Sequence, residues 1–170
     1  MDGTLCPQSG FSPFGPLVEV GVALHPVLVA PSLCAALADL GARPHVTPVW
    51  LTTWPPETRR ALRSPFPGRD WEQIDLDGVG GATGRRWPKW AALTAWLADN
   101  ADITRVAWVD DDLALDAEPD RHHPAGSRAE FCVRELRRRH LDAFAIAPTG
   151  EYGMTPRHLA ELEQVIGRGQ

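Results

Sequence analysis

Three consecutive carboxylates, Asp110 to Asp112, directly follow an apolar segment that is typical of a buried strand. Adjacent carboxylates repel one another unless a cation or a lysine neutralises their charge. Oxygen ligands of this kind suit Mg²⁺, which typically uses one or two carboxylates together with water and substrate phosphate. An acidic run after a strand is also a common loop start or helix cap, so the run alone does not decide between chemistry and structure.

Two other polar residues occupy positions that a phosphoryl site would use. Thr52 follows Trp50 and Leu51 at the end of a second predicted strand, and its hydroxyl could donate to a phosphate oxygen. Lys89 follows a glycine-rich segment at 78–84 and supplies a positive charge. Either residue alone is commonly structural. Together with the acidic run they indicate phosphoryl chemistry, in which catalysis consists mostly of positioning and charge neutralisation.

Strand and helix patterns alternate along the chain and predict the elements that carry these residues. The predicted strands share apolar and β-branched content, and they are 44–51, 71–76, 103–109 and 142–147. The predicted helices share apolar residues at helical spacing after a proline or polar start, and they are 31–41, 55–63, 88 onward, 129–139 and 155 onward. This order predicts a parallel sheet with helices on both faces. Reactive groups gather at the carboxyl ends of such strands, where Asp2, Thr52 and the acidic run fall.

Length and composition predict one globular domain over residues 1–170. Hydrophobic residues make up 44% of the chain and charged residues 23%, and no linker or internal repeat divides it. A small two-stranded flap is expected within about 11–30, because apolar segments at 17–24 and 27–29 are separated by His25-Pro26. The polar, proline-bearing segment 116–127 predicts a loop.

Charge and cysteine content restrict the classes of function. A net charge of -5 gives no sign of nonspecific nucleic-acid binding. A cluster of Arg85, Arg86 and Lys89 could still recruit a nucleic-acid end, whereas the arginines at 134–139 are expected on a solvated helix face. No apolar segment is long enough to span a bilayer, and the first residues do not resemble a secretion signal. The cysteines lack metal-site spacing and indicate reduced thiols of a cytoplasmic protein.

The order of these residues resembles the motifs of the haloacid-dehalogenase (HAD) superfamily. Its members carry an apolar strand ending in Asp-x-Asp-Gly-Thr, a strand-end Thr or Ser, a Lys, and an acidic pair after another strand. Asp2-Gly3-Thr4-Leu5 is similar to the second half of the first motif, and Thr52, Lys89 and Val109-Asp110-Asp111 are similar to the other three. The resemblance implies a three-layer α/β/α Rossmannoid fold with a parallel sheet, a small β flap and no large cap.

A narrower resemblance is to the HAD domain of Swiss-army-knife RNA-repair proteins. The segments that carry it are Trp50-Leu51-Thr52-Thr53-Trp54, Trp87-Pro88-Lys89, Ala107-Trp108-Val109-Asp110-Asp111 and Gly153-Met154-Thr155. This similarity implies a phosphorylated substrate such as an RNA end. It also implies substrate contacts from Thr53, Trp54 and Arg86, and it indicates no particular protein partner.

The superfamily resemblance implies a role for each matching residue. Asp2 would be the general acid and base, and would help to hold Mg²⁺. Thr52 would bind the transferring phosphoryl group, and Lys89 would neutralise charge shared by the phosphate and the acidic run. Asp111 would be the direct metal ligand and Asp110 an indirect one. Asp112 replaces Asp111 in that role if the motif is shifted by one residue.

The first motif departs from the family pattern. The nucleophilic aspartate of the family lies two residues before the general acid, which is ahead of Met1, and the central strand that carries it is expected there too. The chain by itself is therefore expected to be inactive and poorly stable, with a true start further upstream. Two alternatives remain: a non-catalytic HAD-like binding module, and a small-molecule phosphatase such as a nucleotidase.

Overall fold

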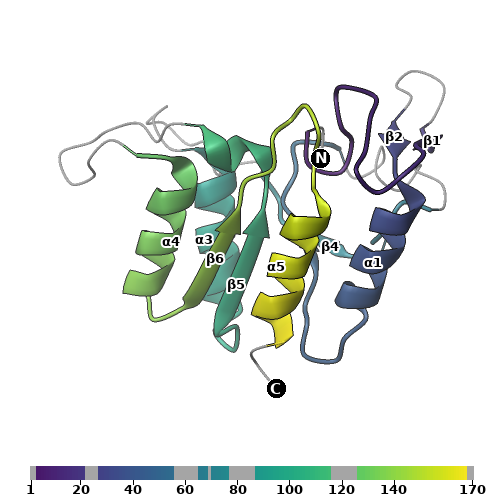
Figure 1. The fold of residues 1–170 in the computed structure, drawn as a ribbon. Coiled ribbons are helices and arrows are strands. Elements are labelled where there is room, and N and C mark those ends of the chain that lie inside the picture. Colours follow the sequence, from purple (N-terminus) through teal and green to yellow (C-terminus); the bar gives the residue numbers. More distant parts are fainter. Residues whose placement is uncertain are drawn as a thin grey trace.

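The computed structural model describes residues 3–21, 27–55, 65–68, 70–76, 87–115 and 126–167. Its α-helices are α1 (Pro31–Gly41), α3 (Pro88–Asp99), α4 (Arg128–Arg138) and α5 (Pro156–Gly167), and a short 3₁₀ helix η1 covers Asp111–Ala114. The strands are β1 (Val18–Glu19), β2 (Leu28–Val29), β3 (Val49–Trp50), β4 (Glu72–Gln73), β5 (Arg105–Val109) and β6 (Asp142–Ile146). Figure 1 shows these elements as a mixed α/β fold.

The strands pair two by two. β5 and β6 are parallel and in register over five residue pairs, from Arg105 opposite Asp142 to Val109 opposite Ile146. β3 and β4 form a shorter parallel pair, and β1 and β2 form the antiparallel flap that the sequence predicts. The α/β class and the parallel pairing are therefore confirmed. A single continuous sheet is not formed by the described strands, because no backbone pairing joins β3 to β5.

One edge of β5 is open within the described residues. Asp142 N donates to Thr104 O, and Asp110 N donates to Ile146 O, so the even-numbered residues of this strand direct their backbone groups to β6. The alternate groups at 105, 107 and 109 point to the opposite edge, where no described backbone group pairs with them. Ala107, in the middle of the strand, is exposed. Parallel strands are normally covered and paired on both sides, so this edge is unusual.

Two hydrophobic clusters hold the helices against the strands. One joins α3, β5, α4 and β6 through Leu93, Trp108, Leu136 and Ala143. The other joins α1, β2, β3 and α5, and it includes Leu33, Trp50 and Leu162 among its buried members. In Figure 1, α4 flanks the β5–β6 pair on one side and α5 on the other. No helix among the described residues has the length and apolar character that a membrane span requires.

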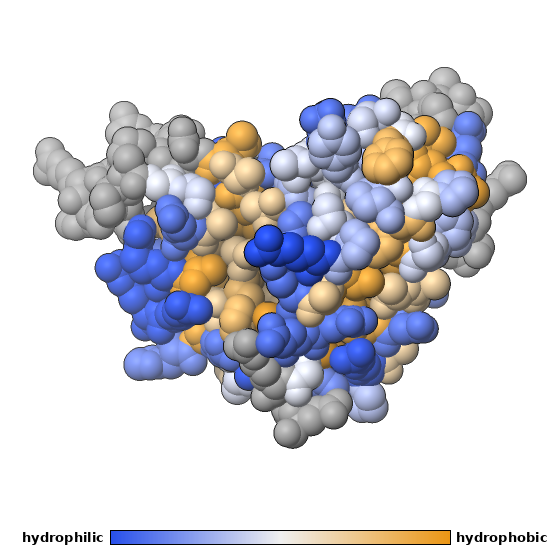
Figure 2. Space-filling model, in the orientation of Figure 1, coloured by the Kyte–Doolittle hydropathy of each residue, from blue (hydrophilic) through white to orange (hydrophobic). Residues whose placement is uncertain are grey.

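The helices begin at residues that favour a helix start. Prolines occupy the first turns of α1 and α3, where the missing N–H costs nothing. Ser127 and Glu130 form a reciprocal capping box at the start of α4. The exposed side of α4 carries Arg137 and Arg138, and Figure 2 shows a hydrophilic surface over this helix, as expected for a solvated face. The predicted helix 55–63 lies almost entirely, and the predicted loop 116–127 mostly, outside the described residues.

Candidate functional site

Lys89 is at the centre of a buried charge cluster. It lies in the first turn of α3, only 7% exposed, and its ammonium group donates to both Asp110 oxygens at 2.9 and 2.8 Å and to Asp112 Oδ2 at 2.9 Å. Burial alone would lower the pKa of Lys89, but the adjacent Asp110 and Asp112 carboxylates outweigh it and raise that pKa. The lysine is therefore held as a cation beside the carboxyl end of β5.

Both carboxylate oxygens of Asp110 accept hydrogen bonds within this cluster. Its Oδ1 also accepts a hydrogen bond from the backbone N–H of Asp112, and its Oδ2 accepts one from the Trp108 indole N–H at 3.4 Å. Asp110 is also the N-cap of η1 and is 4% exposed. Both of its oxygens are thus occupied by protein donors. This carboxylate fixes the lysine and the turn after β5, which leaves Asp111 as the freer neighbour.

The N-terminal segment contacts the acidic run directly. Thr4 Oγ1 donates to Asp111 Oδ1 at 2.9 Å and accepts from the Asp111 N–H at 3.2 Å, although the two residues are 107 positions apart. Gly3 has a φ of 78°, and a Cβ there would lie 2.7 Å from Asp111 Cγ. Only glycine fits this backbone conformation and this close approach. Gly3 and Thr4 therefore lie directly against Asp111 of the acidic run.

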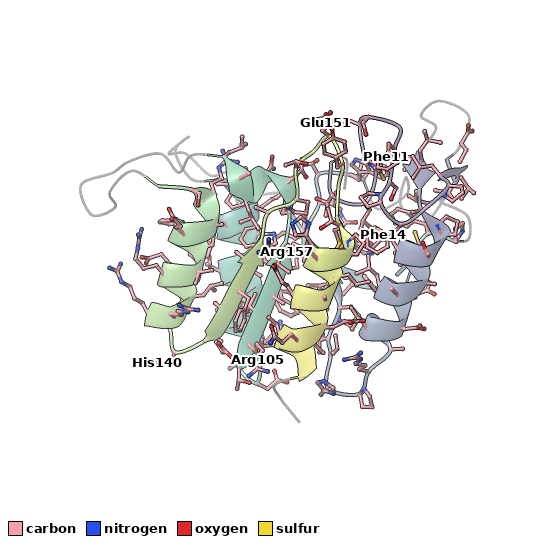
Figure 3. The ribbon with its side chains drawn as sticks, in the orientation of Figure 1. Phe11, Phe14, Arg105, His140, Glu151 and Arg157 are labelled. Carbon is pink, nitrogen blue, oxygen red and sulfur yellow. The ribbon has the colours of Figure 1, made fainter. Side chains whose placement is uncertain are left out.

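The loop after β6 closes a third side of the site. Met154 N donates to Thr4 O at 2.8 Å, and Gln8 N donates to Gly150 O at 3.1 Å. Gly153 has a φ of 66°, and a Cβ there would lie 2.8 Å from Thr4 O. Figure 3 shows Glu151 of this loop near Phe11, at the end of the molecule opposite Arg105 and His140. The site is therefore at the carboxyl ends of β5 and β6, as expected for a parallel α/β protein.

The other predicted site residues are not brought into this cluster by any described contact. Thr52 is 2% exposed, and its hydroxyl accepts a hydrogen bond from Trp54 N at 3.2 Å. Trp54 O accepts from Gln73 Nε2, and Thr53 is exposed. Among the described residues, no hydrogen bond joins Thr52 to the acidic run. Asp2 and Arg86 lie outside the described residues.

The amino-acid composition also marks the position of this site. Lys89 is the only lysine in the 170 residues, and every other basic side chain except histidine is arginine. A lysine ammonium is a compact charge with three donors, whereas a guanidinium is a planar fork. Here all three donors reach carboxylate oxygens. The only lysine of the chain therefore lies at the position where a compact cation contacts the carboxylates.

The site fits a divalent cation in charge but is incomplete within the described residues. The run 110–112 carries three carboxylates, and the Lys89 ammonium pairs with those of Asp110 and Asp112, which leaves an excess of negative charge that a cation would neutralise. Asp111 Oδ2 accepts none of the described hydrogen bonds and faces the Gly3 and Gly150 backbones. No group of three or more His, Cys, Asp or Glu side chains in the described ranges forms a metal site. Of the carboxylates in the run, Asp111 is the one that could hold a cation, and a complete site would need further ligands.

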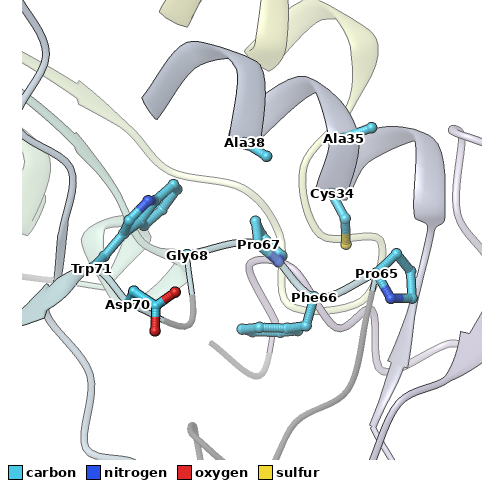
Figure 4. Close-up of a pocket in the computed structure, with 9 residues that line it drawn as sticks. All are labelled: Cys34, Ala35, Ala38, Pro65, Phe66, Pro67, Gly68, Asp70 and Trp71. Atoms are coloured by element: carbon cyan, nitrogen blue, oxygen red, sulfur yellow. The ribbon is translucent and has the colours of Figure 1, made fainter. Parts of the chain in front are cut away.

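A hollow elsewhere on the molecule does not belong to this site. It has a volume of about 480 Å³ and lies between α1 and residues 65–68 and 70–71, and its lining includes Cys34, Phe66 and Trp71 (Figure 4). None of the residues around Lys89 or Asp111 lines it.

No protein-family model, curated protein or solved structure matches this chain. The arrangement of the charge cluster is therefore the basis for any assignment of function.

Proposed function

We propose that the protein is a Mg²⁺-dependent phosphohydrolase of the HAD type that works through an aspartyl-phosphate intermediate. The observation that carries this proposal is the contact between Thr4 and Asp111, with Lys89 on the other side of the same acidic run. Thr4 and Lys89 both contact the acidic run that follows β5, and a phosphoryl site at a strand end would draw on such groups. The acidic run is thus contacted by a buried lysine and by a glycine-threonine segment, and this combination supports the proposal.

Each group would have a distinct task. Asp111 and Asp2 would hold Mg²⁺, which when bound would neutralise phosphate charge. Lys89 would neutralise the negative charge of Asp110 and Asp112 and would add positive charge beside the phosphoryl group. Thr52 would donate to a phosphoryl oxygen, and Asp2 would protonate the leaving oxygen. The nucleophile would be an aspartate two residues ahead of Asp2.

The substrate would be a phosphate group on a large molecule, with an RNA end as the narrower proposal. The short β1–β2 flap supports this, because it is too small to enclose a substrate as a cap domain would. Trp54 and Arg86, with the exposed Thr53, would contact the substrate beyond its phosphate. A cytoplasmic setting belongs to the same proposal, because Cys34 and Cys132 are buried as thiols and are not joined in a disulfide.

The test supplies the nucleophile and compares two matched proteins. One carries an N-terminal extension with an apolar strand and an aspartate directly before Met1, and the other carries asparagine at that added position. We expect Mg²⁺-dependent hydrolysis of p-nitrophenyl phosphate by the first protein only, and its loss in Asp2→Asn. Equal, background turnover by both proteins, when both are folded, would refute the proposal.

The same proteins separate the alternatives. Faster turnover of 3′- or 5′-phosphorylated RNA than of mononucleotides supports the RNA-end proposal, and the reverse order indicates a nucleotidase. Binding of phosphorylated RNA without turnover by either protein indicates a binding module.

A further inference from the structure

Two tryptophans join the same two segments as the Lys89–Asp110 pair. The rings of Trp87 and Trp108 stack with centroids 4.8 Å apart and an interplanar angle of 8°. Trp87 comes two residues before Lys89, and Trp108 comes two residues before Asp110. The start of α3 and the end of β5 therefore make two contacts, one through the stacked rings and one through the ion pair two residues further along each segment.

Helix α3 begins without an ordinary side-chain cap. Trp87 is the N-cap residue of α3 and makes no side-chain capping bond, whereas N-caps are usually Ser, Thr, Asp or Asn. A buried ion pair is favourable only if its geometry is well fixed, and a lysine side chain is long and flexible. Something other than a cap must therefore hold the first turn of α3 in place, and the ring stack is positioned to do so.

Contacts on both sides of the stack extend it. The Trp108 indole N–H donates to Asp110 Oδ2, so the ring touches the ion pair itself. The Arg128 guanidinium at the start of α4 lies 4.7 Å from the Trp87 ring centre. No carboxylate in the described ranges pairs with Arg128. Three elements, α3, β5 and α4, thus meet through these aromatic rings beside the charge cluster.

We infer that Trp87 and Trp108 are positioning residues of the proposed phosphoryl site. Their stack holds the first turn of α3 against the end of β5, so that the Lys89 ammonium stays on Asp110 and Asp112. The inference rests on the proposed function for its catalytic meaning, but the effect on Lys89 can be measured in a protein that has no turnover.

The chain offers a direct probe and a matched control. Because Lys89 is the only lysine, acylation by an amine-reactive ester modifies only this side chain and the terminal amine, which peptide mapping distinguishes. Trp87→Leu removes the stack, and Trp108→Phe keeps a ring but removes the indole donor. Trp90→Leu is the control, because Trp90 lies in the same helix and makes an edge contact with Phe131 of α4.

We expect Trp87→Leu to raise the acylation rate of Lys89 by about 2-fold to 10-fold, the range that loss of an aromatic pair implies. Trp108→Phe should give a smaller rise, and Trp90→Leu should leave the rate unchanged even if it lowers the melting temperature. In the extended, active protein, Trp87→Leu should lower kcat more than it raises KM. The inference is overturned if folded Trp87→Leu reacts like the parent, or if Trp90→Leu reacts equally fast. An absence of phosphatase activity would count against the proposed function alone.

Discussion

Lys89 and Asp110 form a buried ion pair in which one ammonium nitrogen contacts both oxygens of one carboxylate, at 2.9 and 2.8 Å. Both side chains are less than a tenth exposed. Charges buried in this way are costly unless they are paired, so each depends on the other. The third ammonium donor reaches Asp112, whose side chain is 37% exposed and is therefore the open side of the cluster.

Removing the lysine charge should be strongly destabilising. Lys89→Met leaves Asp110 buried without its cation, and we expect the free energy of unfolding to fall by about 3–5 kcal/mol. The control is Arg157→Gln, which breaks the exposed i,i+4 pair with Glu161 and should cost about 0.5 kcal/mol or less. Urea unfolding at pH 7 measures both. A loss below about 1 kcal/mol in Lys89→Met would contradict the buried-pair interpretation.

Gly3→Ala should be worse than the same change at another glycine with the same backbone conformation. Gly10 has a φ of 72° and no atom within 4 Å of an added Cβ, so Gly10→Ala carries only the left-handed backbone cost of about 1–2 kcal/mol. Gly3→Ala carries the same cost, and its added Cβ would also clash with the Asp111 carboxylate. Thermal unfolding of the two variants should therefore differ, and equal melting temperatures would show that Gly3 does not contact Asp111.

Thr4 should tune the affinity of the proposed metal site. Thr4→Val keeps the shape of the side chain but removes its hydrogen bonds with Asp111, and the loss of such a supporting bond typically lowers metal affinity by about 10-fold to 100-fold. The control is Thr94→Val, which removes a hydroxyl bonded to Ala91 O inside α3. Mn²⁺ binding followed by electron paramagnetic resonance measures both. Equal affinity in the parent and Thr4→Val would exclude Asp111 as the principal ligand.

Two buried thiols should make the fold sensitive to alkali. Burial raises the pKa of Cys34 to about 11 and that of Cys132 to about 12. In the unfolded chain a thiol loses its proton near pH 8.5. The contribution of the buried thiols to the free energy of unfolding is therefore fully present below about pH 8.5, and it is lost as the pH rises toward 11 or 12. We expect a loss of up to about 2 kcal/mol per cysteine between pH 7.5 and pH 10.

The measurement is urea unfolding at both pH values, with a Cys34→Ala/Cys132→Ala double variant as the control. The double variant should be less stable at pH 7.5 but should lose less stability on the alkaline side. An identical pH dependence in the two proteins would show that these thiols are not responsible.

Local patterns were sufficient to predict most elements of the described fold. The helices at 31–41 and 129–139 agree with the structure to within one residue, because proline starts, caps and apolar spacing act over a single turn. The predicted strand 44–51 is reduced to the two residues of β3, because strand pairing depends on distant partners. Propensity alone cannot supply those partners.

The site was predicted in part for the same reason. The sequence placed Lys89 with the acidic run, because strand ends and helix starts meet at one edge of a parallel pair. It could not decide which carboxylate pairs with the lysine, since three identical residues stand in a row. The contacts between Thr4 and Asp111 and between Trp87 and Trp108 join segments that are far apart in the chain, and no local pattern encodes them.

The open edge of β5 predicts two classes of amide in one strand. The N–H groups at 106, 108 and 110 are directed to β6, whereas those at 105, 107 and 109 have no described backbone partner. Hydrogen–deuterium exchange should therefore alternate along the strand, slow at even positions and fast at odd ones. An added strand that pairs with this edge would slow the odd positions selectively, so the exchange pattern would report directly on whether the sheet has been completed.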